Sequence, residues 1–148
     1  MAARLKSAAI VLSAGFLGSA LAAADTTKHA WTASAASPAL HSVGQAQTVT
    51  YTPERNAIPP GAVVTRVRAD RRYTGDAMVQ TSLCWNGAAR CVDIVGPSLM
   101  TGAFDGLDAG RPFHLVHRVV DWRGSRPPVH VQGNVTVWFS LPPAPRAQ

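Results

Sequence analysis

Cysteine is scarce in this chain, and the motifs of several well-known enzyme classes are missing from it. Only two of the 148 residues are cysteine. The sequence has no Gly-x-Ser-x-Gly motif, which would mark a hydrolase nucleophile, and no Gly-rich phosphate loop. No stretch shows the apolar spacing of an amphipathic helix. These absences favour a binding module over an enzyme.

Long apolar runs are also missing, except at the N-terminus. Residues 1–24 predict a cleavable secretory signal peptide, with cationic Arg4 and Lys6, an apolar stretch and two Ala-x-Ala triplets. The triplets permit cleavage before Ala23 or Asp25. An uncleaved membrane anchor is the alternative, but the apolar stretch is shorter than the roughly 20 residues that span a bilayer. We therefore expect the mature protein to be soluble, with no membrane insertion after cleavage.

The mature chain has the size of one domain. Residues 25–141 predict a single domain, and the proline-rich residues 142–148 predict a flexible tail. Removing the signal peptide leaves 12 of the 14 basic residues against 8 acidic ones, which lowers the formal net charge from +6 to +4. So small an excess is weak support for nucleic-acid binding.

The basic residues cluster in one place only. Arg66, Arg68, Arg71 and Arg72 lie close together, but Asp70 interrupts them and no aromatic residues are interleaved with them. A stacking platform for bases needs such aromatics. We interpret the cluster as the solvated face of a strand, and we expect no nucleic-acid partner.

Apolar residues recur with period two, which is typical of half-buried β-strands. The clearest run covers residues 129–139. Its predicted buried face carries Val129, Val131, Gly133, Val135, Val137 and Phe139, and the opposite face carries His130, Gln132, Asn134, Thr136 and Trp138.

Other runs complete an all-β pattern. Residues 113–120 are apolar on both faces, which predicts a central strand buried on both sides. In residues 62–69 we expect Val63, Thr65, Val67 and Ala69 to share the buried face. Further strands are predicted over 77–83, 90–95 and 47–51, with a weak one near Trp31. Six to eight short antiparallel strands predict an antiparallel β-sandwich or a small barrel.

The two cysteines flank a strong turn signal. Asn86-Gly87 lies between Cys84 and Cys91, and both turn residues tolerate positive φ. Cysteines placed on either side of such a turn can face each other across a hairpin. We predict one disulfide-linked hairpin in a protein of an oxidising compartment.

Candidate catalytic residues are few. His114 and His117 form an HxxH pair, but on a strand residues three apart point to opposite faces, so we expect no metal site. His130 is interpreted as solvated. Three aspartates lie in loops and are interpreted as turn formers: Asp105, Asp108 and Asp121. We therefore expect no catalytic residue and no cofactor.

Several sequence blocks resemble a known family. They are residues 83–92 (Leu-Cys-Trp-Asn-Gly-Ala-Ala-Arg-Cys-Val), Gly96, Gly102-Ala103-Phe104, 109–113 (Ala-Gly-Arg-Pro-Phe), 127–131 (Pro-Pro-Val-His-Val) and 134–137 (Asn-Val-Thr-Val). In this order, and over about residues 60–139, the chain resembles the FlhE family of flagellar periplasmic proteins.

The resemblance implies a function without catalysis. It suggests a periplasmic protein of the flagellar system, which acts as a chaperone-like factor in flagellar assembly or as a regulator of proton tightness at the export gate. Its expected partners are flagellar export or rod components. The candidate partner-binding residues are the tryptophans on predicted polar positions, namely Trp85, Trp122 and Trp138.

Two other classes of protein fit the same sequence. A periplasmic inhibitor or a carbohydrate- or peptidoglycan-binding module would share the size, the signal peptide and the single disulfide. A small hydrolase would need a histidine with a carboxylate partner in a cleft.

Overall fold

The computed structural model describes residues 29–143 of the chain. The predicted signal peptide over 1–24 lies outside the described residues, and so does the end of the predicted tail, 144–148. Those two predictions, and the division of the chain that they imply, therefore stay predictions. Within residues 29–143, no helix is long and apolar enough to cross a membrane.

Eight strands form the described part of the chain. They are His29–Ala36 (β1), Ala46–Tyr51 (β2), Val63–Arg72 (β3), Met78–Trp85 (β4), Arg90–Ile94 (β5), Ser98–Thr101 (β6), Phe113–Asp121 (β7) and Gln132–Ser140 (β8). All strand pairs within the sheets are antiparallel. The predicted all-β, antiparallel fold is confirmed.

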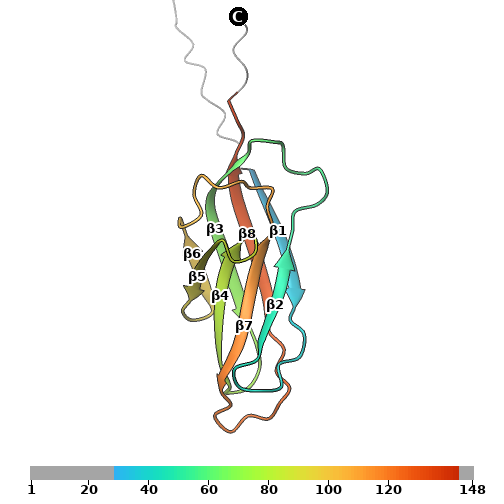
Figure 1. Cartoon of the computed structure of the whole chain (residues 1–148), viewed down its shortest axis with the longest axis vertical. Helices are drawn as coiled ribbons and strands as arrows, with labels where there is room; N and C mark the ends of the chain where they lie inside the picture. The colour runs from blue at the N-terminus through green and yellow to red at the C-terminus, as the bar shows by residue number, and fades with distance from the viewer. Residues whose placement is uncertain (1–28, 144–148) are drawn as a thin grey trace, which may run out of the picture.

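The strands make two four-stranded sheets that stack face to face. One sheet has the order β1-β8-β3-β6 and the other the order β2-β7-β4-β5; we refer to them as the β8 sheet and the β7 sheet. Figure 1 shows the two layers, with β1 and β2 along one side of the molecule and β5 and β6 along the other. The fold is therefore a β-sandwich and not a closed barrel.

The last strand has the predicted alternation. The strand begins at Gln132 and not at Val129. Val135 and Val137 on its inward face are buried, as is Val131 just before it, while Trp138 on the opposite face is half-buried. β8 pairs with β1 on one side and with β3 on the other. It is therefore, with β3, one of the two inner strands of its sheet.

In β3 the predicted burial pattern is wrong at the start of the strand. Val64 is buried, whereas Val63 is half-buried and Thr65 is exposed. The register with β8 shifts directly after Val64, and such a bulge inserts one residue and reverses the alternation. Beyond the bulge, Val67 and Ala69 are buried as predicted.

β7 is central, as predicted, since it pairs with both β2 and β4. Burial on both of its faces is wrong, however. The inward residues are fully buried, but Val120 on the outer face is 46% exposed. In the described part of the chain each sheet is covered on one side only, so the apolar residues on the outer face of β7 have no second layer above them.

The cysteine hairpin is confirmed. Cys84 and Cys91 lie directly opposite each other on β4 and β5 and are disulfide-bonded, with Cα atoms 4.1 Å apart. Asn86 and Gly87 have φ angles of 50° and 78°, as the turn signal requires. The bond thereby fixes the register of the hairpin at one side of the sandwich.

One aromatic side chain crosses the core from sheet to sheet. Tyr51 of β2 donates its hydroxyl to the carbonyl oxygen of Ala35 in β1, at 3.3 Å, and burial raises the Tyr51 pKa to about 12. It passes Gly133 so closely that a Cβ there would overlap the Tyr51 hydroxyl and lie 2.7 Å from Leu115 Cδ1. Position 133 therefore needs glycine because of close approach.

Substitutions along β8 test the register. Val135→Asp or Val137→Asp should lower the free energy of unfolding by more than about 4 kcal/mol, since each buries an unpaired carboxylate. Thr136→Asp faces outward opposite Arg68 and should cost only about 1 kcal/mol, from the lost hydrogen bond to Thr32. Urea unfolding measures all three. A larger loss for Thr136→Asp would mean that the register is wrong by one residue.

The close approach at Gly133 gives a second stability test. Gly133→Ala should destabilise the protein by about 1–3 kcal/mol, because the new methyl group overlaps Tyr51 and crowds Leu115. Adding Tyr51→Phe, which deletes the overlapping hydroxyl, should recover part of that loss. Thermal unfolding of the two single variants and the double variant measures this coupling. Additive effects would contradict the described contact.

Candidate partner-binding surfaces

The three tryptophans proposed to bind a partner lie apart from one another. Trp85 ends β4 opposite Phe113, the first residue of β7, whereas Trp122 follows the last residue of the same strand. Trp138 belongs to the other sheet. All three side chains are half-buried. The structure therefore does not bring them together into one site.

Trp85 and Trp122 each have contacts within the protein. Trp85 packs against the main hydrophobic cluster and donates its Nε1–H to the carbonyl oxygen of Asp108 at 3.0 Å. Trp122 packs against a second, smaller cluster that contains Leu40 and Val131. These contacts account for their half-burial, and a partner-binding role for either residue stays a prediction.

Trp138 lies on the outer face of the β8 sheet. Its cross-strand neighbours are Ala30 of β1 and Arg66 of β3. Polar pairs cover the same face further along: Thr32 with Thr136 at 2.9 Å, Asn134 with Ser34 at 2.6 Å, and the Arg68–Asp70 ion pair at 3.0 Å. Trp138 is thus an aromatic side chain on a mainly polar surface beside the edge strand β1.

A polar layer of Arg71, Thr81 and His117 lies between the two hydrophobic clusters. On β7, His117 stands between Leu115 of the main cluster and Val119 of the smaller one, and Thr81 pairs with His117 from β4. Arg71 reaches this level from β3, so the layer links the two sheets. The inward orientation of Arg71 was not predicted from the sequence, although the alternation Val67, Ala69, Arg71 indicates it.

Hydrogen bonds in the polar layer assign the proton positions. Arg71 Nη1 donates to Thr81 Oγ1 at 2.9 Å and also to the carbonyl oxygen of Val79. The other partner of the Thr81 hydroxyl is His117 Nδ1, at 2.9 Å. Because arginine has no acceptor, the Thr81 proton goes to His117 Nδ1, and the histidine carries its own proton on Nε2. That Nε2 is buried without a hydrogen-bond partner among the described residues.

The environment of His117 favours its neutral form. Burial, and then the charge of Arg71, lower the His117 pKa from 6.5 to about 4. Burial also lowers the pKa of His114, whose Nδ1 lies 3.0 Å from Thr50 Oγ1 on the outer face of the β7 sheet. The two histidines face opposite sides of their strand, as the sequence predicts.

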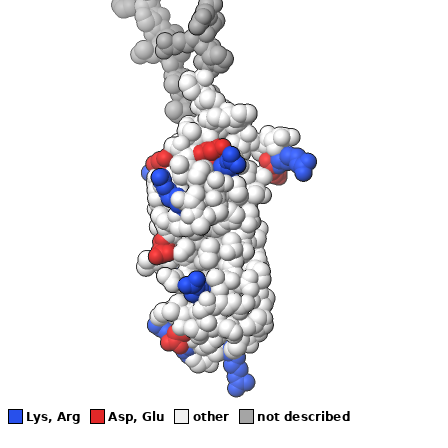
Figure 2. All heavy atoms as spheres, in the orientation of Figure 1, with Lys and Arg blue, Asp and Glu red and all other residues white. Residues whose placement is uncertain are grey.

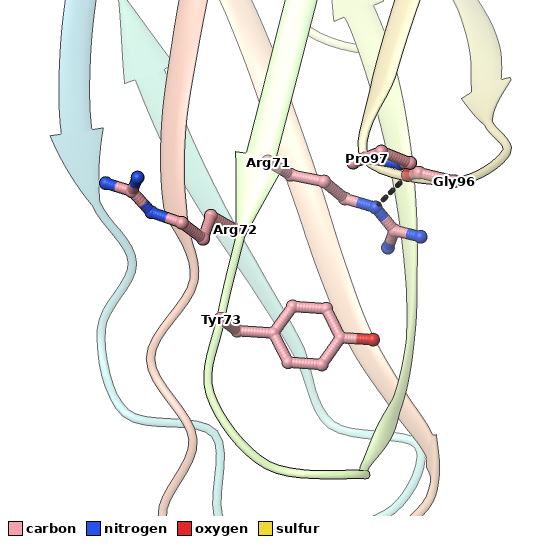
Figure 3. A pocket seen from close by; sticks show the side chains of 5 residues that line it. All are labelled: Arg71, Arg72, Tyr73, Gly96 and Pro97. Atoms are coloured by element: carbon pink, nitrogen blue, oxygen red, sulfur yellow. Dashed lines mark hydrogen bonds between the residues drawn. The ribbon is translucent and has the colours of Figure 1, made fainter.

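A hollow of about 350 Å³ lies beside the polar layer. It is lined by Arg71, Arg72, Tyr73, Gly96 and Pro97. Figure 3 shows Arg71 reaching across to Gly96, whose carbonyl oxygen accepts from Nε at 2.8 Å, while the Arg72 guanidinium points to the other side of β3. Three backbone or side-chain oxygens therefore already hold Arg71, which acts as a strut between elements.

The remaining polar residues do not converge on a catalytic arrangement within residues 29–143. Asp108 and Asp121 accept hydrogen bonds from the backbone N–H groups of Gly110 and Arg123, as turn formers do. His130 is exposed. No group of three or more His, Cys, Asp or Glu side chains in the described chain could hold a metal ion. In Figure 2 the charges of both signs are scattered over the visible face, with no patch of a single sign.

Comparisons with known proteins extend the description of this disulfide-linked β-sandwich. Residues 37–139 match the family described as flagellar protein FlhE, and the chain belongs to the FlhE family. A solved structure described as the crystal structure of FLHE is 21% identical, with a TM-score of 0.62, and the match covers 77% of this chain and 98% of that one. No curated protein matches the sequence. The sequence-based resemblance is confirmed.

The polar layer predicts a pH dependence of stability. Because the folded-state pKa of His117 is about 4 and its ordinary value is 6.5, the unfolded chain takes up the proton first as pH falls. The stabilisation is complete above about pH 6.5 and is lost towards pH 4, by up to ~3 kcal/mol. Urea unfolding of the wild type between pH 7 and pH 4 should show this loss.

A variant separates the contribution of His117 from the general acid response. His117→Leu should flatten the pH dependence of the unfolding free energy in this window. If His117→Leu had the same pH profile as the wild type, the buried neutral histidine would not be the cause.

Proposed function

We propose that this protein acts in the periplasm as a non-catalytic, chaperone-like factor of flagellar assembly, which binds flagellar export or rod components. The observation that carries the proposal is the match of residues 37–139 to the FlhE family of flagellar proteins. That range includes the strands β2 to β7 and nearly all of β8. Binding is the activity that the scaffold supports best, because a sandwich covered on one side of each sheet leaves two outer faces and four strand edges exposed to partners.

The disulfide supports the choice of compartment. Structural disulfides form and persist in oxidising compartments such as the bacterial periplasm. The Cys84–Cys91 bond joins two directly paired strand residues, and it belongs to the folded framework. Together with the predicted signal peptide over 1–24, it argues for export from the cytoplasm.

Complementation of a deletion strain tests this function. Deleting the gene in its flagellated host should impair swimming and leave flagellin in the periplasm, and the full chain should restore both. A version lacking residues 1–24 should fail to complement, because it cannot reach a periplasmic partner. Cytoplasmic pH in the same strains measures whether the protein also limits proton leakage through the export gate.

Histidine variants serve as controls for the absence of catalysis. His114→Ala and His130→Ala change exposed or half-buried outer positions and should complement as well as the wild type. Loss of complementation by a folded, abundant variant of either residue would contradict a non-catalytic role. A deletion strain with normal motility, normal flagellin export and normal cytoplasmic pH would contradict the flagellar proposal itself.

A further inference from the structure

Within residues 29–143, one strand edge of the sandwich has none of the usual protection against pairing with another chain. β1 lies at the edge of the β8 sheet and, among the described residues, pairs along its length with β8 alone. Its eight residues, His-Ala-Trp-Thr-Ala-Ser-Ala-Ala, contain no lysine, arginine, aspartate, glutamate or proline. Natural edge strands are commonly blocked by charges, prolines, bulges or short length.

The hydrogen-bond pattern identifies the groups that β1 presents to solvent. Ser37 directly follows β1, and its N–H donates to the carbonyl oxygen of Val131, which continues the register of the β1–β8 pair. The backbone groups of residue 37 therefore point to β8. In an antiparallel pair this orientation alternates. The N–H and C=O groups of Ala30, Thr32, Ser34 and Ala36 therefore point away from the sheet, along an edge of about 20 Å.

The other three edge strands are shorter, and one of them carries charges. β6 has four residues, and beyond it the free edge of β3 is covered by the segment 106–109, which makes backbone hydrogen bonds to Ala62 and Val64. β5 has five residues, two of them the charged Arg90 and Asp93. β2 is uncharged but has only six residues. β1 is the longest edge, and all eight of its residues are in register with β8.

We propose that the free edge of β1 is a strand-addition site for an extended segment of an unfolded flagellar subunit. The choice of a flagellar subunit rests on the proposed function. The site itself rests on the edge chemistry, because unpaired backbone groups along one edge are satisfied by another extended backbone. The family match begins at residue 37, directly after β1, so the site is inferred from the structure of this strand and not from the family match.

The side chains beside the edge define the segment that fits. On the inner side, Ala33 and Ala35 are small, half-buried and packed against the main cluster, so apolar side chains of an added strand would extend the core. On the outer side, Ala30 is small and leaves Trp138 accessible across β1. The segment should therefore be uncharged and should alternate apolar residues with small or polar ones.

Binding of flagellin diluted from guanidinium tests the site. Thr32→Pro removes an outward N–H and places a ring on the edge, without removing a bond to β8. It should weaken binding by about tenfold or more, the loss expected when one or two hydrogen bonds and the close strand contact are removed. Thr32→Ala, which keeps the N–H, should bind like the wild type. Fluorescence anisotropy of labelled flagellin measures the affinities.

A matched control lies on the other uncharged edge. The Cα atoms of Cys84 and Cys91 are 4.1 Å apart, the short separation of an antiparallel pair that shares no backbone hydrogen bonds, so the backbone groups of Cys84 point to β7. When the same alternation is followed across β7, the backbone groups of Thr48 point outward from β2. Thr48→Pro should therefore leave flagellin binding unchanged. Thermal unfolding checks that each proline variant is folded, and Ala30→Pro replaces Thr32→Pro if the latter is not.

The outcomes separate this inference from the proposed function. If flagellin bound the Thr32→Pro and Ala30→Pro variants as tightly as the wild type, the β1 site would be wrong while the chaperone role stood. The same would follow if Thr48→Pro abolished flagellin binding. If flagellin did not bind the wild type at all, or if two copies of the protein paired through β1, the site would also be wrong. The deletion phenotype tests the flagellar role independently of all these results.

Discussion

The burial of one face of each sheet against the other is the interaction on which the rest of this structure depends. The fully buried residues of β7 and β8, among them Leu115, Val119, Val135 and Val137, supply much of that interface, and burial of apolar area is the main driving force of folding. Tyr51 extends across the interface to Ala35, which is possible because residue 133 has no side chain. Since this packing uses only the inner faces, the outer faces and the edges are free to serve binding.

The polar layer has a different role from the apolar core. Arg71 joins β3 to Val79, Thr81 and Gly96, so one guanidinium connects the two sheets and the segment that leads to β6. Buried polar groups contribute most when their hydrogen bonds are satisfied, and in this layer the hydrogen bonds of Arg71 and Thr81 also set the tautomer of His117. Arg71, which lines the hollow, therefore has a structural role in joining the two sheets.

Local periodicity predicted the features that depend on neighbouring residues. The alternation in β8 and the Cys84–Cys91 hairpin are examples, because both follow from side-chain period and turn chemistry. The bulge after Val64 and the four-residue strand β6 were not predicted, since both are defined by pairing with distant strands. For the same reason the sequence placed Trp138 on a polar face but could not show that the strand beside it is an unprotected edge, which depends on sheet order.

Amide hydrogen exchange of β1 tests the central claim most directly. In the free protein, the outward amides of Ala30, Thr32, Ser34 and Ala36 should exchange quickly, while the intervening amides that bond to β8 are protected. Adding flagellin diluted from guanidinium should slow exchange at these four outward positions. Unchanged exchange along β1, with new protection on β2 or around Trp85 or Trp122 instead, would contradict the account.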